Sequence, residues 1–381
     1  MKARVLPLAL LLSGCAALPG GKGSEGLFAD RLFGPPATVV DTAVLFESSE
    51  AMRAYVAGPL GKRVQKLGSQ EALVRALGDD VRLEYDAART RTAAEAFEAR
   101  TGNCLSLVAM AYVLARELGI PAQIQSVRGS YTWMRQQGIS IRSGHTNLVL
   151  GSTFDRVPGG LRLHRQVVDF LPPPDGERWA SGRVLGEETV LAMYGNNRAA
   201  EVLIEGDVDT SYWWARAAIS ASPVFLPAHN TLAVIYMRHG NLAEAERTLR
   251  HVLEREPENA EALNNLVLAL SRQGRAAEAD AVRARLAKIA PHPPYQYLDQ
   301  GLQALARGEI DEAERLIRKE LKRMPYDDEV NLALAVVTLR LGDVEAAREH
   351  MRRAMENSPT RERRQIYSSK LKQIQQAPAP R

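Results

Sequence analysis

Cys104, His145 and Asp169 have the side-chain types and the surroundings that thiol chemistry requires. Cys104 comes first, at the start of a predicted helix. The residues after it form an apolar stripe with the spacing of a buried helix, at Leu107, Ala111, Leu114 and Leu118. Gly119 and Pro121 are typical of the end of such a helix. Free backbone amides and the positive end of the helix dipole stabilise a thiolate at a helix start, so this position favours a nucleophilic cysteine.

His145 and Asp169 lie on expected strands that follow this helix. Short strands are predicted at 122–127, 146–150 and 166–170, with a polar loop between the first two at 130–143. Neighbouring antiparallel strands can bring the histidine and the aspartate side by side, facing the helix start. A thiol nucleophile needs a base within hydrogen-bonding reach, and the base needs an orienting carboxylate. The order cysteine, histidine, aspartate therefore predicts a catalytic triad.

The first residues indicate export and lipid attachment. Lys2 and Arg4 precede an apolar run over 5–12, which is far shorter than the roughly 20 residues of a transmembrane helix. The run ends in Leu12-Ser13-Gly14-Cys15, which resembles the lipobox of bacterial lipoproteins. That resemblance implies that Cys15 is acylated and becomes the N-terminus. Ala16 after it resembles the signal for delivery to the outer membrane, so we expect a lipid-anchored protein of the cell envelope, on the periplasmic face of that membrane.

The chain has only two cysteines. If Cys15 carries lipid, Cys104 has no partner for an intrachain disulfide. An unpaired thiol in an oxidising compartment needs a reason. One reason is burial as a small apolar side chain, and the other is catalysis.

A family resemblance rests on the same residues. Gly102-Asn103-Cys104, the helix end at 118–122, Gly144-His145 and Val168-Asp169 resemble the bacterial transglutaminase-like domain, which has a papain-like thiol fold. The similarity covers roughly 45–175. It implies that Cys104 is the nucleophile, His145 the general base and acid, and Asp169 the residue that orients His145. The Cys104 backbone amide would form part of the oxyanion hole, while Tyr85 and Asn103 are candidates for its second donor.

Two features depart from this family's pattern. Many relatives carry a tryptophan shortly before the catalytic glycine, where this chain has 98–100, Glu-Ala-Arg. Many also follow the histidine with a small residue and a tryptophan, where this chain has Thr146 and Asn147. Neither change touches the triad. Both leave the substrate and the oxyanion geometry open.

The second half of the chain repeats every 34 residues. Three residue types recur in phase, at Gly240, Gly274, Gly308 and Gly342, at Ala245, Ala279, Ala313 and Ala347, and at Pro257, Pro291, Pro325 and Pro359. Such a unit is a helix-turn-helix, with glycine at the turn and proline ending the second helix. With Leu232 and Tyr236, the pattern resembles the tetratricopeptide repeat, although Gln300 departs from it. The resemblance implies a concave surface for a protein or peptide ligand.

Tyr212, Trp213 and Trp214 precede the clear repeats, within a degenerate unit that ends at Pro223. They are candidate aromatic anchors for a ligand. Alternatively they fill the packing between repeats or at the junction with the first domain.

The expected fold is therefore an α+β transglutaminase-like domain followed by an all-α solenoid. The boundaries are a signal peptide at 1–15, a flexible tether at 16–40, the thiol domain at 41–175, a connector with the degenerate repeat at 176–225, four repeats at 226–360, and a capping helix with a tail at 361–381.

The composition argues against several other functions. The formal net charge of +4 is small and includes the two basic residues of the signal, so no nucleic-acid partner is expected. No pair of histidines or cysteines has the spacing of a metal site, and no glycine-rich phosphate loop occurs. We therefore expect no metal and no cofactor.

Two functions remain open from the sequence. The first is a membrane-anchored thiol hydrolase or acyl transferase that acts on amide bonds of peptides or proteins recruited by the repeats. The second is a scaffold lipoprotein whose thiol domain is not catalytic and whose repeats assemble envelope proteins. A role in exporting or assembling surface polymers has only the lipoprotein signal behind it. The acyl acceptor, the repeat ligand and the oligomeric state are not predicted.

Overall fold

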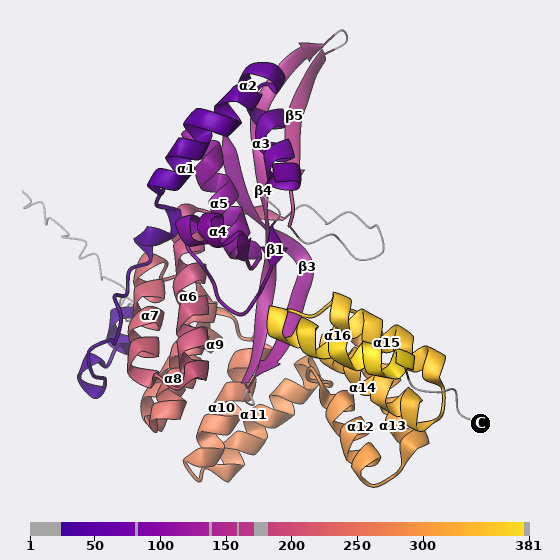
Figure 1. The fold of residues 1–381 in the computed structure, drawn as a ribbon. Helices are drawn as coiled ribbons and strands as arrows, with labels where there is room; N and C mark the ends of the chain where they lie inside the picture. Colours follow the sequence, from indigo (N-terminus) through magenta and orange to yellow (C-terminus); the bar gives the residue numbers. More distant parts are fainter. Residues whose placement is uncertain (1–23, 81–82, 137–138, 158–159, 171–181, 377–381) are drawn as a thin grey trace, which may run out of the picture.

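The computed structural model describes residues 24–80, 83–136, 139–157, 160–170 and 182–376 (Figure 1). The signal peptide, Cys15 and the tether up to residue 23 lie outside the described residues. Within them, a mixed α/β region is followed by a run of helices, which confirms the predicted fold class. Among the helices of these ranges, none combines the length and the apolar character that crossing a bilayer requires.

The α/β region is built around one buried helix and an antiparallel sheet. Its elements are α1 (Glu50–Tyr55), α2 (Gly61–Leu67), α3 (Ser69–Arg75), β1 (Glu84–Tyr85), α4 (Ala93–Ala99), β2 (Thr101–Gly102), α5 (Cys104–Glu117), β3 (Ala122–Gln136), β4 (Ile139–Val157), β5 (Gly160–Val168) and β6 (Arg183–Val184). The four-stranded sheet has the order β5-β4-β3-β6, and β1 pairs with β2 in parallel. Helix α5 packs against β3 and β4.

The predicted helix after Cys104 is confirmed as α5. Its apolar stripe is buried, with Leu107 and Leu114 each 1% exposed. The Asn103 side chain caps its start, and Gly119 follows its end with a φ of +67°. A left-handed residue at this position is the usual glycine stop. The helix therefore begins at the cysteine, as the sequence pattern requires.

The predicted loop at 130–143 is wrong, because this segment belongs to a long hairpin. β3 and β4 pair from Ala122↔Leu150 to Gln136↔Ile139, with a register shift between Ser126 and Tyr131. Tyrosine, threonine, tryptophan and isoleucine suit a pleated strand, and the run Ile-Ser-Ile at 139–141 alternates with period two. The polar residues between them hid this alternation. β4 continues into a second hairpin with β5, so the predicted strands are longer than expected.

The second half consists of helical hairpins. Its helices are α6 (Glu187–Glu205), α7 (Val208–Ala221), α8 (Leu226–His239), α9 (Leu242–Arg255), α10 (Ala260–Arg272), α11 (Ala276–Ile289), α12 (Gln296–Ala306), α13 (Ile310–Arg323), α14 (Asp328–Arg340), α15 (Val344–Glu356) and α16 (Arg361–Gln376). The turn glycines at 206, 240, 274, 308 and 342 all have positive φ. This confirms the role predicted for the repeated glycine.

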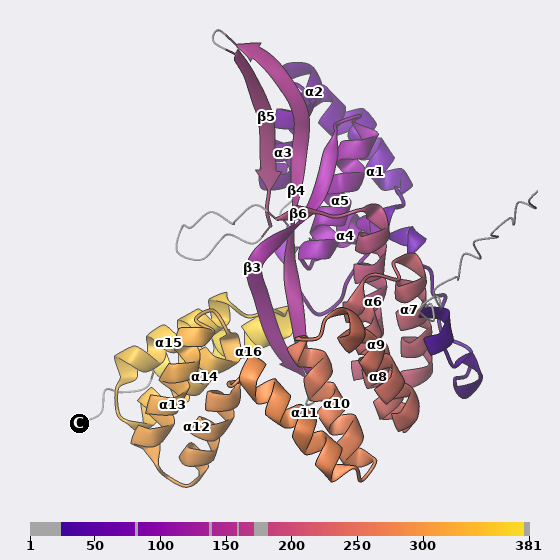
Figure 2. The same cartoon turned by 180° about the vertical axis from the view of Figure 1, so that it is seen from behind.

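The hydrophobic core of the repeats is interrupted between α11 and α12. One buried cluster extends from the α/β region to Ala279 in α11, and a separate one begins at Tyr295 and Leu298. The linker contains Pro293 and Pro294 besides the repeated proline. In Figures 1 and 2 the pair α10–α11 and the pair α12–α13 diverge from this linker. The array therefore consists of two blocks joined by a proline-rich segment.

The expected flexible tether at 16–40 is wrong from Ser24 onwards, because this segment packs against the repeats. The Phe33 ring stacks on Tyr212, with 4.0 Å between the ring centroids. The Tyr212 hydroxyl accepts from the Ala29 amide at 3.0 Å, and Asp209 accepts from the Gly34 amide at 2.9 Å. The glycines and prolines of the segment suggested a linker, but its leucines and phenylalanines are placed to cover α7, α8 and α9.

The three aromatic residues of α7 serve this packing. Tyr212 and Trp214 are 0% and 4% exposed, and the Trp213 indole donates to the Gly34 carbonyl at 2.7 Å. Tyr212 and Trp213 seal the junction with the N-terminal segment, and Trp214 packs against Tyr194 of α6, so the role of ligand anchors does not fit them.

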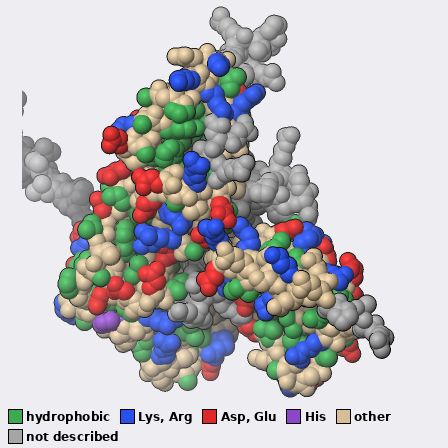
Figure 3. All heavy atoms as spheres, viewed as in Figure 1, with side chains coloured by type: hydrophobic (Ala, Val, Ile, Leu, Met, Phe, Trp, Pro, Cys, Tyr) green, Lys and Arg blue, Asp and Glu red, His purple; other side chains and the backbone are tan. Residues whose placement is uncertain are grey.

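The end of the array returns to the α/β region. The Ala87 amide donates to the Pro359 carbonyl at 2.7 Å, and Arg364 of α16 lies 3.7 Å from the Glu84 carboxylate. The last repeat therefore contacts the short segment after β1. Over the face in Figure 3, basic and acidic side chains are interspersed on both halves, so that face has no large patch of one sign.

Candidate active site

Cys104 is the first residue of α5 and is 6% exposed. Its amide is one of the four at a helix start that have no partner within the helix. The thiol donates to the carbonyl of Gly144, with 3.9 Å between sulfur and oxygen. Gly144 immediately precedes His145, so this contact joins the helix start to strand β4. A cysteine at such a position combines a stabilised negative charge with a neighbouring base.

His145 and Asp169 form a close pair. The imidazole Nε2 lies 2.8 Å from Oδ1 and 2.9 Å from Oδ2 of Asp169. The pairing of β4 with β5 runs to Leu148↔Val168, so Asp169, the first residue after β5, emerges beside the strand of His145. The structure thus brings together the histidine and the aspartate that the sequence singles out.

The charge state of His145 reflects its burial and two neighbours, Asp169 and Cys104. Burial lowers its pKa, but hydrogen bonds with Asp169 and Cys104 and the negative charges of both raise it, to about 9 in total. Because Nε2 faces Asp169, the other ring nitrogen, Nδ1, is the one available to the thiol. The geometry therefore favours an imidazolium at neutral pH, held between a carboxylate and a sulfur.

Asn147 is a third residue of this cluster that sequence reasoning missed. It lies two residues after His145 on β4, is 2% exposed, and donates from Nδ2 to Oδ2 of Asp169 at 3.3 Å. The residue was noted only as a departure from the family's tryptophan. Its spacing was the available signal, because residues two apart on a strand point the same way.

Asn103 holds the helix start through its side-chain amide. Its Oδ1 accepts from the Ser106 amide at 3.0 Å and from the Ser106 hydroxyl at 2.9 Å. Its Nδ2 donates to Thr90 Oγ1 at 2.8 Å. The amide is therefore engaged at both its oxygen and its nitrogen, and the residue is 8% exposed. Tyr85, the other candidate from the sequence, is not used in capping the helix.

Glu201, a buried carboxylate of the helical half, supports the Asn103 side chain that caps the start of α5. Glu201 of α6 accepts from the Thr90 amide at 2.7 Å and from its hydroxyl at 2.6 Å. Burial raises the pKa of Glu201, and Arg198 is its ion-pair partner. The chain of contacts from Glu201 through Thr90 to Asn103 ties the start of α5 to the first repeat helix. Nothing local to Glu201 in the sequence indicated this role.

Tyr85 lies on β1 opposite Gly102, two residues before the cysteine. Burial raises its pKa, and the negative charges of Cys104 and Asp86 raise it further. Its phenol therefore stays protonated and can donate a hydrogen bond near the thiol. The neighbouring Glu84 and Ala87 are the residues that contact the last repeat.

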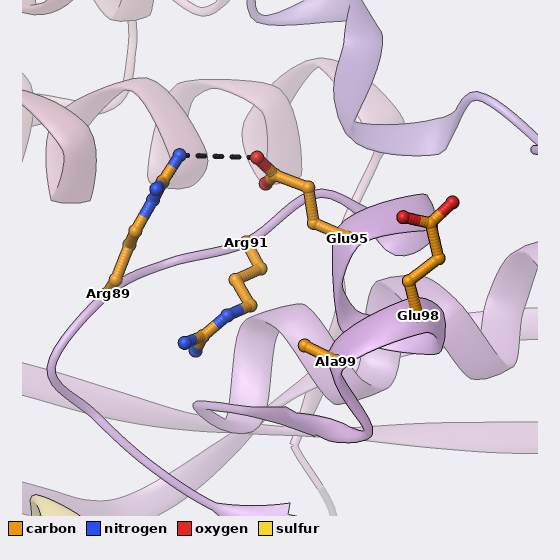
Figure 4. Close-up of a pocket in the computed structure, with 5 residues that line it drawn as sticks. All are labelled: Arg89, Arg91, Glu95, Glu98 and Ala99. Carbon is orange, nitrogen blue, oxygen red and sulfur yellow. Dashed lines mark hydrogen bonds and ion pairs between the residues drawn. The ribbon is translucent and has the colours of Figure 1, made fainter.

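A surface hollow of about 420 Å³ lies beside this region, between α4 and the segment before it (Figure 4). Two arginines and two glutamates line it with one alanine, at Arg89, Arg91, Glu95, Glu98 and Ala99. Arg89 and Glu95 form an ion pair at 3.2 Å. The lining is balanced in charge and includes none of the three triad residues, so we assign it no chemistry. Within the described ranges, no three histidine, cysteine or carboxylate side chains cluster as metal ligands would.

Substituting Asp169→Asn is expected to lower the pKa of His145 from about 9. The direction follows because the hydrogen bond and the charge of the carboxylate raise this pKa and both are lost, while burial still lowers it and Cys104 still raises it. The imidazolium would then lose its proton at a lower pH than in the parent chain. NMR titration of the histidine ring protons measures this, with the His145→Ala spectrum identifying the resonance. A His145 that still titrates near 9 would contradict the assignment, and Cys104→Ala isolates the thiol's share.

Substituting Gly102→Ala is expected to displace the segment that precedes Cys104. A Cβ at this position would lie 2.7 Å from Ser106 Cβ, which is fixed to the backbone of α5 and cannot move aside. The overpacking should cost about 1–3 kcal/mol of unfolding free energy. Urea unfolding measures that loss. The matched change Gly78→Ala, with no atom near the new methyl group, should cost far less.

Comparison with known proteins supports the division of the chain into an α/β region and a run of helices. Residues 60–146 match the model of the transglutaminase-like superfamily, and residues 230–292 and 298–362 match that of the tetratricopeptide repeat. The two repeat matches stop and resume around the proline-rich linker. A search of the curated proteins found no match. The repeat matches support protein or peptide binding in general.

Solved structures with similar folds are repeat proteins. TTC0263, a thermophilic protein of Thermus thermophilus, is 22% identical, with 47% of this chain and 98% of that chain covered and a TM-score of 0.30. PilF of Pseudomonas aeruginosa is 19% identical, with 50% and 94% covered and a TM-score of 0.28. YrrB, described as having an unusual peptide-binding site, is 15% identical, with 48% and 94% covered and a TM-score of 0.26. At such TM-scores these resemblances say nothing about what this chain binds.

Proposed function

Because the chain joins a transglutaminase-like domain to tetratricopeptide repeats, we propose that it is a thiol enzyme acting on amide bonds of polypeptides that the repeats recruit. The observation that carries the proposal is the pairing of His145 with Asp169 at 2.8 Å beside a cysteine at a helix start. The raised pKa of His145 supports an imidazolium next to the sulfur. This is the resting state that a thiol acyl-transfer enzyme needs.

In the proposed reaction the Cys104 sulfur attacks the carbonyl carbon of an amide. The C–N bond breaks, and His145 gives its Nδ1 proton to the departing amine, so that a thioester remains. Water or a second amine then attacks the thioester, His145 takes up the proton of the attacking group, and the thiolate leaves. Asp169 keeps the imidazole oriented through Nε2 and stabilises its charge, while Asn147 holds the carboxylate.

The negative oxygen that forms during each attack needs hydrogen-bond donors. The Cys104 amide is one, because a helix start leaves it without an internal partner. Tyr85 is the second donor that we propose, since it lies opposite Gly102, two residues before Cys104, and keeps its proton. Substituting Tyr85→Phe would then slow turnover without slowing alkylation of the thiol.

A non-catalytic scaffold is the second candidate, and three observations favour it. Cys104 is only 6% exposed, and Asn147 replaces the tryptophan that many relatives carry. The segment beside Tyr85 is also covered by the last repeat. If the chain is an enzyme, the contacts between the last repeat and the segment beside Tyr85 open when substrate enters. If the chain is a scaffold, these contacts are permanent.

The location that we propose is the periplasmic face of the outer membrane, with a lipid on Cys15. The lipobox-like sequence at 12–15 and Ala16 support it. Mass spectrometry of the N-terminal peptide from envelope fractions tests it, since the acylated cysteine adds fatty-acid mass. A Cys15→Ser chain should leave the membrane fraction. An unmodified cysteine in mature protein would refute the anchor.

The activity is tested with the full chain bearing Cys15→Ser, incubated with casein and a fluorescent primary amine. Peptide release indicates hydrolysis, and fluorescence on casein indicates transamidation. Either signal must disappear in Cys104→Ala. If neither signal appears and the thiol is as unreactive as in the His145→Ala chain, the remaining function is that of a scaffold.

A further inference from the structure

A directed chain of hydrogen bonds runs from the segment before α4, through the start of α5, to helix α6. The Arg91 amide donates to Ser106 Oγ at 2.8 Å, and this hydroxyl donates to Asn103 Oδ1 at 2.9 Å. Asn103 Nδ2 donates to Thr90 Oγ1 at 2.8 Å, and the Thr90 hydroxyl donates to Glu201 at 2.6 Å. We call this set the capping chain. Its three middle residues are buried, so bulk water has little access to these bonds.

The two ends of the capping chain fix the direction of the bonds between them. A backbone N–H can only donate, and Oε1 of Glu201 accepts twice, from the Thr90 hydroxyl and from the Thr90 amide at 2.7 Å. The groups between are ambivalent, because a hydroxyl both donates and accepts and an asparagine amide has nearly the same shape in its two orientations. Since Glu201 takes the hydrogen of the Thr90 hydroxyl, that oxygen presents its lone pairs to Asn103. The amide of Asn103 therefore presents its own oxygen to the helix.

The orientation of the Asn103 amide bears on Cys104, the next residue. Asn103 Oδ1 accepts from the Ser106 amide at 3.0 Å, which satisfies one of the backbone donors that a helix start leaves open. The reversed amide would point Nδ2 at this N–H group, and two donors would face each other. The first turn of α5 would then loosen, together with the amides and the dipole that stabilise a thiolate.

Glu201 comes from the helical half but is fixed against the α/β region. Its ion-pair partner on α6 is Arg198, and the two side chains are 16% and 13% exposed. The Arg198 guanidinium lies over the buried Trp214 ring, 5.8 Å from the ring centroid. Near the other end of α6, Glu187 accepts from the Tyr112 hydroxyl of α5 at 2.6 Å. Helix α6 therefore braces α5 along its length and holds the carboxylate in place.

We propose that Glu201 is a positioning residue for Cys104, because it orients the Asn103 cap through Thr90 and thereby sets the reactivity of the thiol. The inference rests on the proposed function and adds to it a residue from the helical half. Glu201 does not touch the reacting atoms, so it acts only through the start of α5. The thiol site is then complete only when α6 is in place beside it.

The test uses the full chain with Cys15→Ser and four substitutions in the capping chain. Glu201→Ala and Thr90→Val each remove a link, whereas Glu201→Gln keeps the acceptor oxygen and Thr90→Ser keeps the hydroxyl. Glutamine loses the same charge as alanine does, so the difference between these two variants reports the acceptor alone. Thr90→Val takes away a single hydroxyl and carries the test should Glu201→Ala fail to fold.

Two readouts follow the start of α5. The first is the pH profile for alkylation of Cys104 by iodoacetamide, whose acidic limb marks the protonation of the thiol. In Glu201→Ala and Thr90→Val this limb should move to higher pH, and the rate on it should fall roughly fivefold, which is the equilibrium effect of losing a helix cap. The second is hydrogen exchange of the Ser106 amide, followed by NMR, which should become faster. Glu201→Gln and Thr90→Ser should keep the parent's values in both.

Asn196→Ala is the matched control for a general loss of stability. Asn196 also lies on α6, but it accepts from Thr231 Oγ1 of α8 at 2.7 Å and has no part in the capping chain. Its substitution should lower the urea midpoint of unfolding and leave both readouts as in the parent. Three results overturn the inference. They are a limb that shifts equally in Asn196→Ala, parent values in both link-breaking variants, and a Glu201→Gln chain that behaves like Glu201→Ala.

The exchange of the Ser106 amide separates this inference from the proposed activity, because it needs no reactive thiol. If both readouts respond to Glu201→Ala and no amide chemistry is found, the proposed function fails alone. If amide chemistry is found and neither readout responds, the positioning role of Glu201 fails alone.

Discussion

Replacing His145 with alanine is expected to slow the alkylation of Cys104 by iodoacetamide roughly thirtyfold at pH 7, because only about 3% of an ordinary thiol is ionised at that pH. The thiolate reacts and the thiol does not. With its pKa raised to about 9, the imidazolium of His145 stays charged throughout the neutral range and favours a negative sulfur beside it. Alanine removes both that charge and the proton acceptor.

The pH dependence makes this prediction sharper. In the parent chain the imidazolium persists as pH rises and is lost only near pH 9, so the alkylation rate should vary little between neutrality and that point. In His145→Ala the rate should instead rise steeply with pH over the same range, because no neighbouring imidazolium then keeps the sulfur charged. Stopped alkylation followed by mass spectrometry gives both profiles.

A matched control is His239→Ala, since His239 is exposed on α8, far from the thiol in the sequence. It should react as the parent does. If His145→Ala remains folded by circular dichroism and alkylates like the parent, the histidine does not activate the cysteine. The proposed enzyme would then lose its main support.

Features that depend on short segments could be predicted from the sequence. The start and end of α5 follow from its apolar stripe and from Gly119, because helix signals act over one or two turns. The 34-residue period likewise predicted the positions of the turn glycines. Cys104, His145 and Asp169 were identifiable because thiol chemistry uses few residue types. Their spacing in the sequence could not show that Asn147 completes the carboxylate's contacts.

The features that escaped prediction depend on distant partners. Glu201 supports the cap of α5 from 111 residues away, and nothing in its own helix distinguishes it. The interruption after α11 had a partial signal, since Pro293 and Pro294 delay α12 until Gln296, two residues later than the period of Leu226 and the later repeats requires. Tyr295 before it adopts a φ of +65°, which is uncommon for a bulky residue. Pro291 alone marks the repeat boundary in the 34-residue pattern, so the pattern missed the break.

The packing of the N-terminal segment gives the second large expected effect. Tyr212→Ala should lower the free energy of unfolding by about 3–5 kcal/mol, because it empties a fully buried aromatic site. The ring stacks on Phe33, and the hydroxyl donates to Asp30 at 2.5 Å and accepts from Ala29. These partners all belong to residues 24–40. The substitution should therefore also release that segment to proteolysis, while cleavage elsewhere changes less.

Urea unfolding and limited proteolysis measure the two effects, and Tyr212→Phe is the matched variant. Phenylalanine keeps the stacking and loses only the hydroxyl contacts, so it should cost about 1–3 kcal/mol. If the segment resists protease equally in all three chains, it is held by other contacts. The outcome bears on the proposed anchor, because a chain lipidated at Cys15 and held at 24–40 is tethered through α7 to α9. The membrane would then hold the repeats directly, through the contacts of residues 24–40 with α7 and α8.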